Sequence, residues 1–405
     1  MRSRVEAIKT QDGATVSGVL YSIGQERTVV MAMHPREFIA AHYMVPEILR
    51  GGCAAWVQAP RSVGNDLRLE HEIALYDVAA GVAYLKSAGY DNIVLLGNSG
   101  GASLFAFYME QASLEPDARI SRTPGGRPTK LKDASLPEAD GLVLLAPHPG
   151  QGILLMHSID PSVTDERDPF STDESLSPFH PSNGFKKPPE SATYEADFIR
   201  RYREAQRARV HVIDKVARNA IEQRMRARRK FKERGDFSNA VAAAYSPIMT
   251  VWRTDADLRC FDLSIEPTDR RYGTLWGANP AASNFGAVGF ARTCTPESWL
   301  STWSGLSSNA ALVRTLPAVK APTLLIAYTG DNSVFPSDIN AVTRALGASD
   351  ITKHDIRGDH HGAALSEDEE SGQLIAGRTL RRWLCERFPD AKTERDDAAA
   401  KEAQQ

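Results

Sequence analysis

The stretch Asn92-Ile-Val-Leu-Leu-Gly-Asn-Ser-Gly-Gly-Ala-Ser-Leu-Phe105 decides the fold of this chain. It opens with an uninterrupted apolar run, residues 93–96, which is typical of a central parallel strand covered on both faces. The run stops at Gly97, and the apolar residues that resume at Leu104 predict a helix. The stretch therefore predicts a strand, a sharp turn and a helix in direct succession.

The turn has the spacing G-x-S-x-G, with Ser99 between Gly97 and Gly101. A serine in such a nucleophile elbow takes a strained backbone conformation above the edge of the sheet, beside the free N–H groups of the following helix. The flanking glycines stand where any side chain would crowd the turn. A serine between glycines also occurs in ordinary turns, but the buried strand before it and the apolar helix after it favour the elbow.

Composition excludes several classes of protein. The chain has 405 residues, 42% of them hydrophobic, which allows one large α/β domain with an insertion or two domains. Its net charge of −3 gives no reason to expect nucleic acid or an anionic membrane as a partner. Neither a leader nor a membrane-spanning run is apparent. We therefore expect a soluble cytoplasmic protein with a small-molecule substrate, and a homodimer is one option for its assembly.

The sequence gives no support for a metal or another cofactor. No H-E-x-x-H, Walker loop or post-strand G-x-G-x-x-G is present. Four cysteines lie far apart without a C-x-x-C pair, which disfavours zinc and a disulfide framework. We expect these to be free buried thiols: Cys53, Cys260, Cys294 and Cys385.

Strands and helices alternate along both ends of the chain. Residues 5–9 and 14–21 predict an antiparallel hairpin, and a long helix is expected over residues 70–87. Further strands are expected at residues 28–33, 54–59, 93–96, 141–146, 323–327 and 351–356. This alternation predicts an α/β fold with a mostly parallel central sheet and helices on both faces.

The segment between the strands at 141–146 and 323–327 is too long for one crossover, so it predicts an insertion. Residues 160–190 are rich in Pro, Ser and Asp and predict a loop that is ordered or partly disordered. Residues 196 to about 229 predict an amphipathic helix. Residues 245–303 are rich in aromatic residues and glycine, and we expect them to wall a pocket.

The expected helix is strongly basic. Residues 200–234 hold fourteen Lys or Arg and four Asp or Glu, a net charge of +10 that leaves −13 for the rest of the chain. One interpretation is a basic lid that attracts acidic substrates or a phosphate-bearing carrier. The other, which we favour, is a solvated helix face or a contact to an acidic patch.

A serine hydroxyl is a weak nucleophile at neutral pH, so it needs a base and a group that orients the base. Asp331 follows the strand 323–327 directly and is the best acid, with Asp338 second. The turn after the strand 351–356 holds two adjacent histidines, of which we take His360 as the base and His361 as the alternative. The order Ser, Asp, His at successive strand ends favours a catalytic triad.

Acyl transfer also requires N–H donors for the oxyanion. Gly100 is expected to supply one by its position after the serine. The second should come from the loop after the strand 28–33, where Pro35 has no N–H, so Arg36 is the expected donor and Glu37 the next choice. His34 is expected to brace this loop beside the pocket.

Two further residues are expected to line the pocket. His148 follows the strand 141–146 at the same sheet edge, and a direct catalytic role for it is left open. Trp276 belongs to the aromatic region that should wall the pocket.

Together, the elbow at residues 93–101, the His34-Pro35-Arg36 loop, Asp331 and the Gly358-Asp359-His360 turn resemble the α/β-hydrolase superfamily. The resemblance covers about residues 5–146 and 317–383 and implies an α/β-hydrolase fold with a Ser-His-Asp triad. Where many relatives carry His, Glu or Asp before the nucleophile, this chain has Asn98, and Pro35 replaces a glycine.

The resemblance also implies the domain organisation. The core comprises residues 1–150 and 317–386, and residues 151–316 resemble the large, mainly helical cap that this fold inserts after its sixth strand. Residues 387–405 form a charged tail. The cap matches no subfamily of known substrate.

Three functions follow as hypotheses. The first is a serine hydrolase that cleaves a carboxylic ester, a lactone or a thioester of a small molecule through an acyl-serine intermediate. The second is carbon–carbon bond cleavage in a diketone by the same triad. The third is a non-catalytic ligand receptor on the same scaffold.

Overall fold

The computed structural model describes residues 1–64, 66–235 and 237–389, so the predicted tail lies outside the described residues from 390 onward. Within the described part of the chain, the central sheet has eight strands in the order β1-β2-β4-β3-β5-β6-β11-β12. These strands are β1 (Arg2–Lys9), β2 (Thr15–Ser22), β3 (Thr28–Met33), β4 (Ala54–Gln58), β5 (Asn92–Asn98), β6 (Gly141–Leu145), β11 (Thr323–Tyr328) and β12 (Ile351–Ile356).

The sheet is mostly parallel. β1 and β2 form the predicted antiparallel hairpin, and β2 runs antiparallel to β4. From β4 through β3, β5, β6 and β11 to β12 every neighbouring pair is parallel. The predicted fold class is thereby confirmed, and the carboxyl ends of these parallel strands meet at one edge of the sheet.

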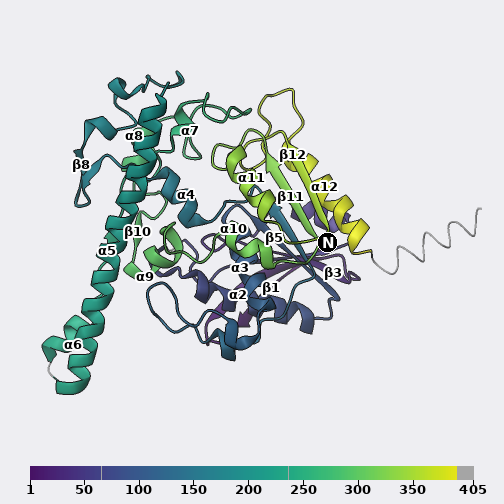
Figure 1. Cartoon of the computed structure of the whole chain (residues 1–405). Coiled ribbons are helices and arrows are strands. Elements are labelled where there is room, and N and C mark those ends of the chain that lie inside the picture. The colour runs from purple at the N-terminus through teal and green to yellow at the C-terminus, as the bar shows by residue number, and fades with distance from the viewer. Residues whose placement is uncertain (65, 236, 390–405) are drawn as a thin grey trace, which may run out of the picture.

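Helices cover both faces of the sheet (Figure 1). The residues of β5 alternate between two apolar clusters: Ile93 and Leu95 pack with α2 and α3, whereas Val94 and Leu96 pack with α1 and α12. This double burial explains the uninterrupted apolar run. The helices beside the sheet are α1 (Val45–Arg50), α2 (His71–Ser87), α3 (Gly100–Ser113), α11 (Pro336–Ala345) and α12 (Gly372–Arg387).

Residues 151–316 lie between β6 and β11 and are mainly helical. Their short strands pair with one another, β7 with β8 and β9 with β10, in two separate two-stranded sheets. The elements are α4 (Gln151–Ser158), β7 (Val163–Asp165), β8 (Asp168–Thr172), α5 (Ala196–Arg234), α6 (Phe237–Ala244), β9 (Met249–Thr250), α7 (Leu258–Phe261), α8 (Pro280–Phe285), β10 (Thr293–Cys294), α9 (Pro296–Ser298), a π-helical turn (Trp299–Trp303) and α10 (Leu312–Thr315).

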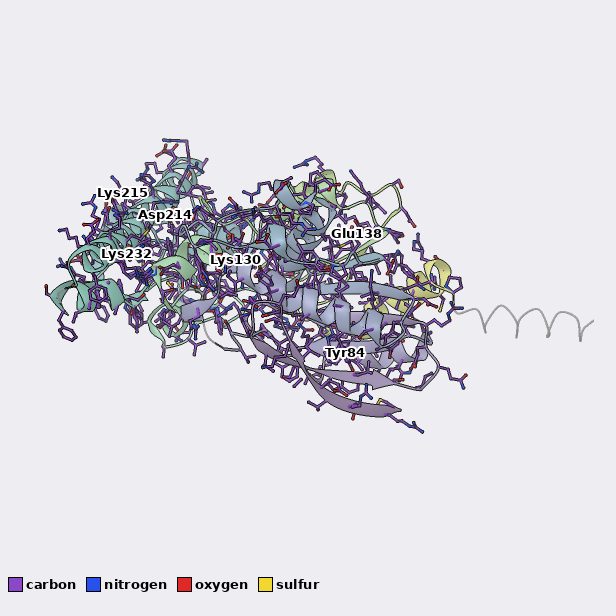
Figure 2. The ribbon with its side chains drawn as sticks, turned by 90° about the horizontal axis from the view of Figure 1, so that it is seen from below. Tyr84, Lys130, Glu138, Asp214, Lys215 and Lys232 are labelled. Atoms are coloured by element: carbon purple, nitrogen blue, oxygen red, sulfur yellow. The ribbon has the colours of Figure 1, made fainter. Side chains whose placement is uncertain are left out.

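The long helix α5 runs along one side of the molecule (Figure 1). It begins at the predicted residue and ends five residues beyond the expected end. Figure 2 shows Asp214, Lys215 and Lys232 on this side of the molecule and Tyr84 on the body that holds the sheet. Asp214 is buried and accepts hydrogen bonds from Trp299 Nε1 at 2.7 Å and Ser304 Oγ at 3.0 Å, which fixes α5 to the π-helical turn of the same insertion.

Several of the basic residues of α5 contact carboxylates. Arg209 Nε lies 2.7 Å from Glu166 Oε1, and Arg203 Nη2 lies 2.8 Å from Asp257 Oδ1. Arg224 pairs with Glu297. These contacts agree with the second interpretation of the basic stretch, in which part of it meets acidic groups.

The structure differs from the sequence prediction in the region 160–190 and at one cysteine. The predicted loop contains the β7–β8 hairpin, in which Val163 pairs with Thr172. Cys385 is exposed, whereas the other three cysteines are buried as expected. Over the described ranges, no helix is both long and apolar enough to cross a bilayer.

Candidate active site

Ser99 lies at the junction of β5 and α3 with φ 54° and ψ −120°, the strained conformation expected of the elbow. Its amide donates to Leu145 O at 2.9 Å. A Cβ at Gly97 would lie 2.5 Å from Ala102 Cα, and one at Gly101 would lie 2.5 Å from Met33 O. Only glycine fits at these two positions, so the G-x-S-x-G spacing follows from the packing of the turn against β3 and α3.

Three of the predicted site residues meet at the carboxyl edge of the sheet. His360 Nε2 lies 3.0 Å from Ser99 Oγ, and His360 Nδ1 lies 2.7 Å from Asp331 Oδ2. The other carboxylate oxygen of Asp331 accepts the amides of Ser333 at 2.7 Å and Val334 at 2.9 Å. These amides fix the position of the carboxylate opposite the imidazole.

The surroundings of His360 set its proton affinity. Burial alone would lower its pKa, but the charge of Asp331 and the hydrogen bond to it outweigh burial and raise the pKa above the usual 6.5. Because the Nδ1–H is directed to Asp331, the neutral ring presents Nε2 as an acceptor to the Ser99 hydroxyl. The arrangement can therefore take the proton from the serine as the oxygen attacks an electrophile.

The alternative base, His361, lies in a different environment. It is exposed and meets the ring of His360 edge-on, with the centroids 5.0 Å apart. Its amide donates to Asp359 Oδ1 and its carbonyl accepts from Gln373 Nε2, contacts that stabilise the turn. The geometry brings His360, and not His361, to Ser99 and Asp331.

His148 also reaches the serine. Its Nε2 lies 3.2 Å from Ser99 Oγ and 3.0 Å from Ser333 Oγ, and its ring stacks on that of His360. Burial and then the charge of His360 lower the pKa of His148 well below its usual value. His148 is therefore a neutral imidazole at physiological pH, with one N–H to donate.

The expected oxyanion donors lie on adjacent segments. The amide of Gly100 begins α3, whereas the Arg36 amide donates to His34 Nδ1 at 3.2 Å. Burial, followed by the charge of Arg36, lowers the pKa of His34 to about 3, so this ring is a neutral acceptor that braces the loop. A side chain at position 100 would lie 2.8 Å from His34 Nε2 and 3.4 Å from Gln151 Nε2.

Trp276 lies at the margin of this region. Its side chain is 41% exposed and packs edge-on against Phe290, with ring centroids 5.8 Å apart. Phe290 in turn contacts Trp303, over which the Arg36 guanidinium lies at 4.9 Å. Trp276 is thus joined to the Arg36 loop through two aromatic rings, and among the described residues no hydrogen bond joins it to Ser99.

Two neighbours of the site were missed by sequence reasoning. Ser333 contacts His148, and its only sequence signal is its position two residues after Asp331. Gln151 starts α4, and its Oε1 is buried without a hydrogen-bond partner among the described residues. Over those same residues, no group of three or more His, Cys, Asp or Glu side chains has the arrangement of a metal site.

Comparison with known proteins finds likeness in structure rather than in sequence. No family model matches the chain, and no curated protein matches it in sequence. DcsB, solved in complex with its substrate analogue, has a TM-score of 0.50 and 13% identity over 96% of this chain and 100% of that chain. The α/β hydrolase GrgF from Penicillium sp. sh18 has a TM-score of 0.48 and 13% identity over 96% and 100% of the two chains.

A third similar structure is Est1E from Butyrivibrio proteoclasticus, with a TM-score of 0.45 and 9% identity over 95% of this chain and 99% of that chain. At such identities the likeness concerns the fold alone. The chain has an α/β-hydrolase fold, in which the chemistry depends on the residues at its own site.

Proposed function

From the α/β-hydrolase fold and the contacts of Ser99, we propose that this chain is a serine hydrolase that cleaves a carboxylic ester of a small molecule. The observation that carries the proposal is the continuous contact from Ser99 Oγ through His360 to Asp331, with the serine held in a strained turn. A buried base with a raised pKa and its own carboxylate is the arrangement that converts a hydroxyl into a nucleophile.

In the proposed reaction, Ser99 Oγ attacks the ester carbonyl while His360 Nε2 takes the serine proton. Asp331 keeps the imidazole in the required tautomer and stabilises the imidazolium. His360 then protonates the leaving alcohol, which departs and leaves an acyl-serine. A water molecule, deprotonated by the same ring, releases the acid and restores the enzyme.

The proposed oxyanion donors are the amides of Gly100 and Arg36. The first is the free N–H of a helix that starts beside the nucleophile. The second has to exchange its present acceptor, His34 Nδ1, for the oxyanion. A lactone or a thioester presents the same carbonyl chemistry and falls within the proposed substrate class.

A series of p-nitrophenyl esters of increasing acyl length tests this function. The wild-type protein should hydrolyse at least part of the series, and Ser99→Ala should lower kcat/KM by about 10³-fold or more. Ser113→Ala, on the same helix, is the matched control, because among the described residues its hydroxyl bonds only to Glu110 O, at 2.9 Å, and its loss should leave the rate unchanged. Equal rates for wild type and Ser99→Ala would refute the proposal.

We also propose a setting for this activity. We propose that residues 151–316 act as a cap that selects the substrate, since they lie between β6 and β11 and their Trp303 packs under the Arg36 guanidinium of the loop after β3. A cytoplasmic location and a small-molecule substrate complete the proposal, with a homodimer as one option for the assembly.

A further inference from the structure

A cavity of about 850 Å³ lies between the second half of α5 and the body of the protein. Ser99, Asp331 and His360 are not among the described residues that form its wall. The wall is built from the β1–β2 turn, the loop before α2 and the start of α2, the loop at residues 122–128, α5 and the start of α9. Its volume is that of a typical small-molecule site.

The wall is rich in arginine and contains no lysine among its described residues. The arginines are Arg61, Arg68, Arg122, Arg127, Arg224 and Arg228. The guanidinium group is planar and matches phosphate oxygens in a bidentate geometry, whereas lysine acts as a point charge. The choice of residue type therefore indicates an oxyanion ligand.

Carboxylates neutralise only part of this charge, and two of them, Glu70 and Glu297, belong to the wall itself. Arg127 pairs with Glu70 at 2.8 Å, Arg224 with Glu297, and Arg61 with Asp12 and Asp77. The three other arginines have no carboxylate partner within the described part of the chain: Arg68, Arg122 and Arg228. The cavity therefore keeps an excess of positive charge.

Arg224 is the most buried of the arginines on α5 that line the cavity. Its side chain is 10% exposed, and its Nε is buried without a hydrogen-bond partner among the described residues. Burial and then the charge of Arg228 lower the pKa of Arg224. The two cations therefore repel each other, and their proximity lowers the stability of the fold. An anion between them would supply the missing acceptor and relieve the repulsion.

The cavity also has an apolar part. Ile73 from α2 and Ile221 and Met225 from α5 contribute to its wall. We propose that this cavity is a second binding site, which takes a small organic phosphate with at least two negative charges and an apolar or planar portion. The arginines hold the phosphate groups, and the apolar side chains cover the organic part.

Isothermal titration of the full chain with ADP and with inorganic pyrophosphate at low salt tests the proposal without reference to hydrolysis. Both probes should bind, ADP more tightly because its base covers the apolar wall, and added sodium chloride should weaken both. The variants Arg68→Glu, Arg122→Glu and Arg228→Glu should each raise the Kd for ADP about tenfold or more.

Arg229→Glu is the matched control, because it makes the same charge change on the same helix at an exposed residue outside the cavity wall. It should change the Kd by less than about threefold. Thermal unfolding of every variant verifies that the fold persists. The proposal would be overturned if neither probe bound. It would also be overturned if Arg229→Glu raised the Kd for ADP as much as the cavity variants do, or if citrate bound as tightly as ADP.

Discussion

His148 stacks on His360 with the ring centroids 5.0 Å apart and an interplanar angle of 21°, and both imidazoles lie within hydrogen-bonding distance of Ser99 Oγ. The hydroxyl has one proton, which the tautomer of His360 directs to its own Nε2. His148 can then interact with Ser99 Oγ only as a donor. In the proposed reaction the two rings therefore have opposite roles toward the same oxygen: His360 accepts its proton, and His148 donates a hydrogen bond to it.

This difference predicts unequal effects of substitution. His148→Phe keeps a stacked ring but removes the donor, so kcat for a p-nitrophenyl ester should fall by about 10- to 100-fold. His360→Phe should lower kcat by about 10³-fold or more, because the base itself is lost. Steady-state kinetics of both variants checks the prediction, and an equal loss in the two would contradict it.

The raised pKa of His360 predicts the acid limb of the pH–rate profile. The base accepts a proton only when neutral, so kcat/KM should fall as the pH drops through a pKa above 6.5. Asp331→Asn removes the charge that raises this pKa, so the limb should move to lower pH while kcat falls by about 10³- to 10⁴-fold. Profiles of the two proteins test this, and an unmoved limb would show that Asp331 does not set the pKa.

The elbow predicts a specific structural cost at Gly97. A methyl group there would lie 2.5 Å from Ala102 Cα, a backbone atom that cannot move without shifting α3. Gly97→Ala should lower the free energy of unfolding by about 3 kcal/mol. Gly51→Ala is the control, since its nearest neighbour is a side-chain carbon of Arg381 at 3.1 Å. Urea unfolding that finds the same loss in both variants would contradict this account.

Buried Glu72 predicts a pH-dependent stability. Burial, opposed by hydrogen bonds from Ser301 and Asn309, raises its pKa from the usual 4.5 to about 7. Between pH 4.5 and about 7, Glu72 is protonated in the folded protein but ionised in the unfolded chain. The free energy of unfolding therefore falls as the pH rises through this range.

Glu72→Gln removes this dependence. The variant should be more stable than wild type at pH 8, by on the order of 2 kcal/mol, with little gain at acidic pH. Chemical unfolding at pH 5 and pH 8 measures the difference. If the free energies of unfolding of the two proteins depend on pH in the same way, a group other than Glu72 is responsible for the dependence.

Much of the fold could be predicted from local patterns. The run at residues 93–96 is apolar at every position because both faces of β5 are covered, and α5 begins where its periodicity begins. Val216 is apolar but 52% exposed, because it lies at the edge of the buried stripe of α5 that Val210, Ile213 and Ala217 mark. Hydrophobic character alone does not identify the buried face.

The unpredicted features depend on contacts between distant segments. The β7–β8 hairpin is short and polar, and Glu166 in its turn is held by Arg209 of α5 while Phe170 stacks on Phe285. Within the candidate site, the sequence places His148, His360 and His361 near one sheet edge. Which ring lies within 3.0 Å of Ser99 depends on turn geometry that the pattern of strands does not encode.

Labelling with a fluorophosphonate, followed by mass spectrometry of the digested protein, tests the central claim most directly. A nucleophile activated by His360 should acquire a single phosphonyl group, located on Ser99, and should do so far more slowly in His360→Phe. Ser99→Ala should not be labelled. Labelling of a different residue, or labelling of Ser99→Ala at the wild-type rate, would contradict the proposal that Ser99 is the nucleophile.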